Sequence, residues 1–583
     1  MGLGSPRLRI LAAAAAIVLL TAAQGAAVER STQTQPQVGV APAGRTMDEP
    51  DAPIRHRALP ELVPARRDDL TRALAAGSIT EARYALARAR SLFRIGVVRR
   101  QYGRVERPNP RDATMILRDL VARYPQLSGR ERRVARSILA RPTDGAADPV
   151  GNGYTVPEAA PLCSTNACYH YVTTTDDAPD LTDANVNGVP DYVDSVGAVL
   201  ENVWAVEITT LGFRAPKSDL TSVNHGPDGK IDFYVTQLGD QALYGYCTTD
   251  DPNAFSGTYP YFDFSAYCVI DDDYALADFP PPSASGLAAL QVTTAHEFFH
   301  ASQFAYDLLD DRWLLEGTAT WIEDEVYDDV NDNVVYLFDS PITKPQRPLD
   351  SNNSRYGVYG GWIFFRFLSE YFASSGVHDT AVIRRAWELA DGSAAGPDEY
   401  SLRAIAHATE ERGVPFRSLL ASFAARNDFP AKWYEEGSSQ RYPLPPLAAK
   451  HTITARRDVV VDGYRMKHLT NRYIAFKPGR GVRSTAKLLV VVDLPAYRTG
   501  SEASVVTRSK SGAVKYYTIS LGRRGDGSRR VPFGRRAIAR VHLVLTNAST
   551  RTTCWVDPNS AYSCAGAPRD DGLRHAFGVA LVQ

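Results

Sequence analysis

Cysteine is scarce in this chain of 583 residues, which contains six, and no two of them are spaced as CxxC. The sequence therefore gives no support for a zinc site built on cysteine thiolates. The cysteines fall into three close pairs, which are Cys163 with Cys168, Cys247 with Cys268, and Cys554 with Cys564. Many connectivities are open to six cysteines. We predict nearest-neighbour disulfides, because each pair lies inside one predicted unit.

Long apolar runs are absent after about residue 23. Before that point, Arg7 and Arg9 precede an apolar run from Ile10 to Ala23, and small residues up to Ala27 follow it. This is the order of parts in a secretory signal peptide. A membrane anchor is the alternative, but the run is shorter than the ~20 apolar residues that a span needs. We predict that residues 1–27 are removed and that the mature chain is secreted to the extracellular space without a permanent membrane anchor.

Lysine is absent from residues 55–141, where 21 arginines accompany 8 acidic residues and give a net charge of +13. Leu, Ile and Ala recur there at steps of three and four residues, which predicts helices. Linkers are expected on either side, at 28–54 and 142–160. An arginine-rich surface can dock on an acidic one, so the segment is either an inhibitory or chaperoning pro-segment or a permanent basic helical domain. Binding to nucleic acid would also suit the positive charge. We expect no nucleic-acid partner, because the chain is predicted to be exported.

Basic residues are rare between residues 151 and 350, where 33 acidic residues accompany 6 Lys and Arg and give a net charge of −27. Short apolar runs such as "KIDFYV" and "YCVIDDDY", bounded by Gly, Pro and Asp, predict strands. Helical spacing returns at about Ser285 and continues to about Glu436. We assign residues 161–436 to one acidic domain with a β-rich half followed by a helical half.

Helical spacing is lacking after "YPLPPL". Strand-like runs such as "KLLVVVDLP" and "ARVHLVLTN" alternate there with Gly- and Ser-rich turns, which predicts a β-sandwich over residues 437–583. The whole chain is therefore predicted to be a multidomain α+β protein.

The stretch "AHEFFHAS" contains two histidines four residues apart, His296 and His300, with Glu297 beside the first. On a helix, residues i and i+4 lie on nearly the same face, so both imidazoles can bind one ion. Zinc polarises a carbonyl and lowers the pKa of a bound water, and a neighbouring carboxylate can take the proton. The alternative is an ordinary amphipathic helix whose histidines bond to the backbone or to carboxylates.

A third histidine is missing from the position six residues after the second, where Tyr306 stands, so one class of zinc peptidase is excluded. Downstream, "RWLLEGTATWIEDEV" places Glu316 on a predicted second helix, from which a carboxylate can reach the same ion. Glu323 and Glu325 are rival third ligands. Glu323 can instead accept a hydrogen bond from a histidine N–H.

"HEFFH" followed by "WLLEGTA" resembles the gluzincin metallopeptidases, and the layout is similar to a group of poorly characterised secreted bacterial metalloproteases. The resemblance covers roughly residues 160 to 375. It implies a zincin-like core, zinc bound by His296, His300 and Glu316, and Glu297 as the general base. Gluzincins commonly add a Tyr or His that stabilises the oxyanion, for which "SRYGVYGGW" offers Tyr356 and Tyr359.

The stretch "DANVNGVPDYVD" has the rhythm of a calcium loop, with Gly188 at its sixth position. Its oxygen ligands would be Asp183, Asn185, Asn187, Asp191 and Asp194. A solvated Asn/Gly turn is the alternative. "NHGPDGKID", with Asp228 and Asp232, is a weaker calcium candidate that a plain hairpin turn explains as well.

These observations predict a secreted zinc-dependent metalloprotease that cleaves a protein or peptide substrate, acts as a monomer and uses Zn²⁺, with Ca²⁺ as a second cofactor. One alternative is a non-catalytic secreted binding or adhesion protein with a vestigial zincin core. The other is an aminopeptidase, although no GxMEN-like element for gripping a substrate amine is present.

Overall fold

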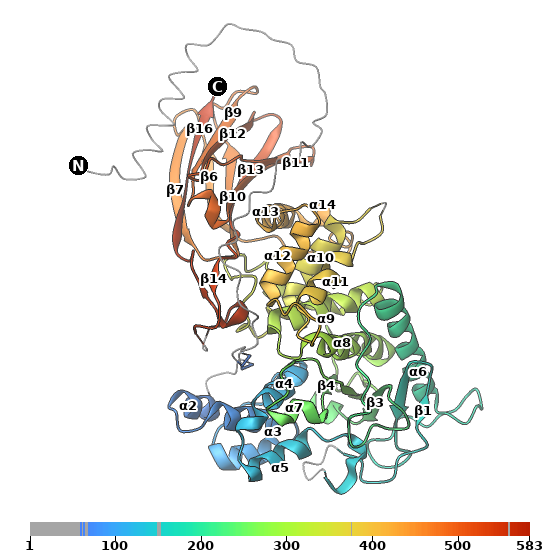
Figure 1. Cartoon of the computed structure of the whole chain (residues 1–583). Coiled ribbons are helices and arrows are strands. Elements are labelled where there is room, and N and C mark those ends of the chain that lie inside the picture. Colours follow the sequence, from blue (N-terminus) through green and yellow to red (C-terminus); the bar gives the residue numbers. More distant parts are fainter. Residues whose placement is uncertain (1–58, 61, 64–67, 148–152, 375, 558–559) are drawn as a thin grey trace. The chain divides into compact units, whose positions relative to one another are not determined.

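The computed structural model describes residues 59–60, 62–63, 68–147, 153–374, 376–557 and 560–583. The predicted signal peptide and the linker at 28–54 lie outside these residues. The chain divides by its internal contacts into two units (Figure 1). The large unit comprises Arg57–Pro446 and Thr550–Arg569, and the small unit comprises Leu447–Ser549 and Asp570–Gln583. The residues before and after the predicted linker at 142–160 both belong to the large unit.

The basic N-terminal segment is helical, as predicted. It contains α2 (Asp69–Ala75), α3 (Glu81–Tyr102), α4 (Ala113–Arg123) and α5 (Gly129–Ile138). Helix starts are fixed by side chains that accept free backbone N–H groups. Asp68 accepts from Thr71 N at 2.8 Å, and Ser128 and Glu131 form a capping box at α5.

A five-stranded sheet forms the β-rich part of the large unit. Its order is β1 (Leu162–Cys163), β2 (Ala167–His170), β3 (Ile231–Thr236), β5 (Tyr267–Asp271) and β4 (Gly245–Thr248). Strands β2, β3 and β5 are parallel, whereas β1 and β4 pair antiparallel at the two edges. Every residue of β3, β4 and β5 is buried, as expected for strands covered on both faces.

Two packed helices, α8 (Gly286–Asp307) and α9 (Arg312–Val326), carry the histidine and glutamate motifs (Figure 1). Helix α8 also packs on β4, on β5 and on α6 (Asp191–Trp204). Apolar residues lie all round α8, which is typical of a buried helix. The unit's other described α-helices are α7 (Pro252–Ser256), α10 (Trp362–Tyr371), α11 (Ala381–Leu389), α12 (Ser401–Glu411), α13 (Phe416–Asn427) and α14 (Pro430–Trp433).

Residues 550–569 leave the C-terminal strands and join the large unit. They contain β14 (Thr552–Thr553) paired with β15 (Ala567–Pro568) and the Cys554–Cys564 disulfide. Ser563 Oγ accepts a hydrogen bond from the buried Trp313 indole at 3.0 Å, and Asn352 N donates to Ala561 O at 2.7 Å. The predicted C-terminal domain comprises residues 437–583. The small unit instead begins at Leu447 and leaves out residues 550–569.

The small unit is built from two sheets (Figure 1). The five-stranded sheet has the order β11 (Val514–Thr518), β10 (Ser501–Ser509), β13 (Ile538–Asn547), β8 (Thr470–Pro478) and β6 (Leu447–Ile453). The four-stranded sheet has the order β12 (Asp526–Pro532), β9 (Lys487–Asp493), β16 (Leu573–Val582) and β7 (Val459–Met466). Buried apolar side chains of both sheets form one core, for example Phe476, Val490, Leu543 and Phe577.

The six cysteines form the three nearest-neighbour disulfides, Cys163–Cys168, Cys247–Cys268 and Cys554–Cys564. Disulfides persist in oxidising compartments, so this pairing fits an extracellular protein. Among the described residues, the helices include none with the length and apolar character needed to cross a bilayer. The fold as a whole is mixed α+β, as predicted.

Candidate metal centre

Three side chains from α8 and α9 converge on one point. His296 and His300 lie one turn apart on α8, and their Nε2 atoms are 3.1 Å apart. Glu316 on α9 places its Oε2 3.4 Å from Nε2 of His296 and 3.8 Å from Nε2 of His300. Gly317 follows, and a Cβ there would lie 2.8 Å from the Phe365 ring, so glycine lets α9 approach α10. The geometry brings together the three residues that the sequence named as zinc ligands.

These distances fit a tetrahedral zinc ion. Zinc–nitrogen and zinc–oxygen bonds of about 2.0–2.1 Å place ligand atoms about 3.3 Å apart at tetrahedral angles. The three observed separations lie around that value. Glu316 is fully buried, and its Oε2 accepts no hydrogen bond from the described residues. A buried carboxylate oxygen without a donor is costly, and an ion between the three atoms would satisfy it.

A glutamine that sequence analysis passed over fixes the tautomer of His300. The Gln303 amide nitrogen donates to Leu315 O at 2.9 Å and to Thr318 Oγ1 at 3.0 Å. Its oxygen must therefore face Nδ1 of His300, which lies 2.7 Å away. The proton then sits on Nδ1, and the Nε2 lone pair is left for a metal. Only the three-dimensional packing of α8 on α9 shows this role.

Glu323 has the same effect on His296, because its Oε1 lies 2.7 Å from Nδ1 of that histidine. Glu323 therefore lies behind the ring and not among the converging ligand atoms, which agrees with the alternative role weighed for it. Glu325 lies away from the centre: it bonds Trp321, at 2.9 Å, and Arg366.

The electrostatics of the centre favour positive charge. Burial works against a charged imidazole, but the neighbouring carboxylates of Glu316 and Glu323 outweigh it and raise the pKa of His296 to about 10. Burial also works against the Glu316 carboxylate, yet both histidines hold its pKa well below the usual value. The donor set thus combines two imidazole nitrogens with an ionised carboxylate, the ligand types of catalytic zinc sites.

Replacing Gln303 by methionine is expected to lower zinc affinity by about 10- to 100-fold, because His300 loses the acceptor that orients its ring. Competition with a chromogenic chelator measures this affinity. Gln291→Met on the same helix is the matched control and should leave it unchanged. Equal affinities for wild type and the Gln303 variant would contradict the assigned role.

Glu297 borders the same small cavity as His296. The cavity is lined by Arg111, Tyr244, Gly245, Val292, Thr293, His296, Glu297, Glu323 and Tyr359. Its volume of about 30 Å³ has room for one or two water molecules. Gly245 on β4 lets that strand approach, since a Cβ there would lie 3.2 Å from Glu297 Cγ. The candidate base, a water-sized space and the three candidate metal ligands therefore lie together.

Of the two tyrosines proposed as oxyanion donors, Tyr359 lines the cavity. Its hydroxyl lies 3.2 Å from Glu316 Oε1, 2.9 Å from Asp112 Oδ1 and 2.7 Å from Arg111 O. Burial raises the pKa of Tyr359, so the hydroxyl keeps its proton. Tyr356 packs on Phe338 with ring centres 5.5 Å apart and is not among the lining residues.

The N-terminal segment enters the centre, which the sequence did not predict in detail. Thr114 of α4 donates a hydrogen bond to Glu297 Oε2 at 2.8 Å, and its oxygen accepts one from Cys247 N on β4 at 2.9 Å. Arg111 lies over the ring of Tyr244 at 4.4 Å and pairs with Asp332 at 3.1 Å. The segment therefore forms hydrogen bonds both to Glu297, the candidate general base, and to the edge strand β4 beside it.

Two further contacts hold this segment against the acidic region. Asp112 forms a buried ion pair with Arg312 at 2.6 Å. Arg141 is fully buried among three carboxylates, at 2.8 Å from Asp219 and 2.8 Å from Asp250, with Asp232 as its third partner. Losing one partner of such a buried pair is strongly destabilising.

The predicted calcium loop is exposed and internally hydrogen-bonded. Asn185 and Asn187 direct their amide nitrogens at Asp194 Oδ2, at 2.9 and 2.8 Å. Asp183 accepts from Gly188 N at 2.9 Å, and Asp191 accepts from Ala184 N at 3.2 Å. Calcium binding here remains a prediction.

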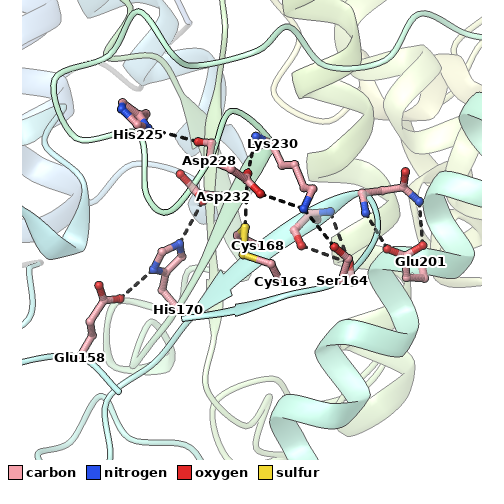
Figure 2. Close-up of a disulfide and its surroundings, with 12 residues drawn as sticks. Glu158, Cys163, Ser164, Cys168, His170, Glu201, His225, Asp228, Lys230 and Asp232 are labelled. Atoms are coloured by element: carbon pink, nitrogen blue, oxygen red, sulfur yellow. Dashed lines mark hydrogen bonds and ion pairs between the residues drawn. A yellow bond between two sulfur atoms is a disulfide. The ribbon is translucent and has the colours of Figure 1, made fainter. Parts of the chain in front are cut away.

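Asp228 and Asp232 have partners of their own (Figure 2). Asp228 accepts from Lys230 N at 2.9 Å and pairs with its ammonium at 2.8 Å. Asp232 lies 3.0 Å from His170 Nε2 in addition to its contact with Arg141. Figure 2 shows the Cys163–Cys168 disulfide beside Asp228, so these sulfurs are not thiolate ligands. The hairpin-turn explanation suits this stretch.

No protein-family model matches the chain, and no curated protein matches it. Among solved structures, one similarity is to CorA, a surface-associated copper-binding protein important in copper acquisition by Methylomicrobium album BG8. It is 8% identical and has a TM-score of 0.14, with 23% of this chain and 98% of that chain covered. Another is to BtGH115A, a family GH115 4-O-methyl-α-glucuronidase with specificity for decorated arabinogalactans. It is 10% identical, with 64% of this chain and 54% of that chain covered and a TM-score of 0.12. Similarities this weak carry no argument about fold or function.

Proposed function

We propose that the chain is a secreted zinc-dependent metallopeptidase of the gluzincin type. The observation that carries this proposal is the convergence of two imidazole Nε2 atoms and one buried carboxylate oxygen, with both Nδ1 atoms held by acceptors. Under this proposal the large unit contains a gluzincin-like core, and the two sheets of the small unit form a β-sandwich.

His296, His300 and Glu316 would hold the zinc ion. Zinc, when bound, would polarise the scissile carbonyl and make a water molecule more acidic. Glu297 is placed to take a proton from the attacking water and to deliver it to the leaving nitrogen. Tyr359 keeps its proton and is placed to donate to the developing oxyanion once Asp112 and Arg111 no longer accept from it.

Strand β4 is the proposed docking edge for the substrate. It is an antiparallel edge strand, and an extended peptide can add to such an edge through main-chain hydrogen bonds. Gly245 brings the strand close to Glu297. A peptide bound there would pass the general base and the converging ligands.

The same contacts support an inhibitory role for the basic N-terminal segment. Thr114 accepts a hydrogen bond from the N–H of Cys247 on β4 and donates one to Glu297, while Arg111 lines the water-sized cavity. A peptide substrate needs both β4 and the base. We therefore favour the pro-segment interpretation over that of a permanent helical domain.

Metal content tests the proposal without depending on the segment. The purified full chain is expected to hold about one equivalent of zinc, because the three ligands are preformed. Phenanthroline should remove the zinc and abolish the casein hydrolysis that remains in the uncut chain, and added zinc should restore both. His300→Ala should lose the zinc, whereas His407→Ala, on the exposed face of α12, should keep it. A folded wild-type chain that binds no zinc would contradict the proposal.

A further inference from the structure

The small unit is strongly basic, which the charge of the whole chain conceals. Residues 447–549 and 570–583 contain 22 Lys and Arg residues and 7 Asp and Glu residues, a net charge of +15. Nineteen of the 22 basic residues are exposed, whereas only Asp458 and Asp526 are exposed among the acidic ones. A surface of this kind attracts polyanions and raises their local concentration.

Many of these charges follow two neighbouring sheet edges. Strand β12 is the edge of the four-stranded sheet, and β11 is an edge of the five-stranded one. The guanidinium of Arg529 on β12 lies 5.5 Å from the ring centre of Tyr517 on β11, so the two edges are side by side. Arg529, Arg530 and Lys515 are exposed along them.

Backbone contacts extend this line of charge at both ends. At one end, Arg523 O accepts from Tyr497 N at 3.2 Å, which brings exposed Arg498 beside exposed Arg523 and Arg524. At the other end, Pro532 is in register with Lys487, and Lys510 N donates to Ala537 O at 2.8 Å. Exposed Arg535 and Arg536 lie in the turn between them.

We define the basic edge as these ten exposed residues, which are Lys487, Arg498, Lys510, Lys515, Arg523, Arg524, Arg529, Arg530, Arg535 and Arg536. Strand β12 alone has 7 residues and is about 23 Å long at about 3.3 Å per residue. The basic edge is therefore long enough for several anionic groups of a linear polymer. Asp526, at the start of β12, is an exposed acidic residue beside the basic edge.

We propose that the basic edge binds an acidic polysaccharide, with sulfate, phosphate or carboxylate groups paired to the arginines. Seven of the ten side chains are arginines, whose planar guanidinium groups can pair with such anions through two parallel hydrogen bonds. Anionic lipid is a poorer partner, because the large apolar side chains that this unit exposes are only Val459 and Tyr516. Single-stranded nucleic acid needs several stacking aromatic rings, and duplex nucleic acid is not an ordinary partner in the oxidising compartment that the disulfides fit.

The experiment uses the full chain and heparin as the probe. Affinity is measured by calorimetry at several salt concentrations, because ion pairing to a polyanion weakens linearly on a log–log plot. The edge variant carries Arg523→Glu, Arg524→Glu, Arg529→Glu and Arg530→Glu. The matched control carries Lys450→Glu, Arg465→Glu, Lys477→Glu and Arg574→Glu, which lie on β6, β7, β8 and β16, away from both edges.

The edge variant is expected to bind heparin at least about 100-fold more weakly and with a smaller salt slope, and the control within about fivefold of wild type. An Arg→Gln set at the same four edge positions should give an intermediate loss, which guards against misfolding in the charge-reversed chain. Equal losses in edge and control variants, or no heparin binding by wild type, would overturn the basic edge as a site. Tighter binding to duplex DNA or to phosphatidylglycerol vesicles than to heparin would contradict the proposal that the ligand is an acidic polysaccharide. Zinc content plays no part in these outcomes, so they are independent of the peptidase proposal.

Discussion

Replacing Glu297 by glutamine is expected to abolish peptide hydrolysis while zinc stays bound. Glutamine has the size of glutamate, and its side-chain oxygen can still accept from Thr114, which lies 2.8 Å from Glu297 Oε2 in the wild type. It cannot take a proton from water at neutral pH. Loss of a general base costs about 10²- to 10⁴-fold in rate. Casein hydrolysis and metal analysis on the same preparation measure both properties.

The surface variant Glu410→Gln on α12 is the control for loss of one carboxylate, and it should match wild type in rate and in zinc content. The result distinguishes the proposed enzyme from a non-catalytic binding protein with a vestigial core. Undiminished hydrolysis by the Glu297 variant would remove Glu297 from the mechanism. An aminopeptidase would instead reveal itself by cleaving only substrates with a free amino terminus.

The convergence of the three candidate ligands could be predicted from sequence because its determinants are local. His296 and His300 need only one helical turn to face one another, and Glu316 lies on the next helix of the chain. The role of Gln303 could not be predicted, because it depends on which backbone carbonyl of α9 its amide meets. From the sequence, Glu323 could be either a third ligand or an acceptor for a histidine N–H. The packing of α9 against α8 brings it to Nδ1 of His296.

Long-range contacts set the limit of prediction for the rest of the chain. The charges of residues 55–141 and 151–350 predicted attraction between them, but not that Thr114 would meet a side chain 183 positions later. Composition likewise indicated a continuous C-terminal domain. The Trp313–Ser563 hydrogen bond, across 250 positions, places residues 550–569 with the large unit, and no periodicity encodes it. Helices and strands can be predicted from the local sequence pattern, whereas contacts between residues far apart in the chain cannot.

Releasing the N-terminal segment is expected to raise peptidase activity by about tenfold or more, because apparent activity scales with the fraction of chains whose site is open. A site-specific protease sequence placed at residues 148–152 allows the full chain to be cut after folding. The cut segment should separate slowly, since Arg141 and Asp112 are held in buried ion pairs. Gel filtration separates the segment-free fraction, whose hydrolysis of a fluorogenic peptide is compared with that of uncut chain.

Arg111→Ala in the uncut chain provides a second measure, because it removes the guanidinium between Tyr244 and Asp332 without cutting the backbone. It should raise activity, whereas Arg130→Ala, at an exposed position of α5, should not. A segment-free fraction that keeps its zinc and its melting temperature but gains no activity would show that the helices are a permanent part of the enzyme. Thr114 would then belong to the substrate site itself, because it contacts both Glu297 and strand β4. Arg111 would belong to it as a residue that lines the same cavity.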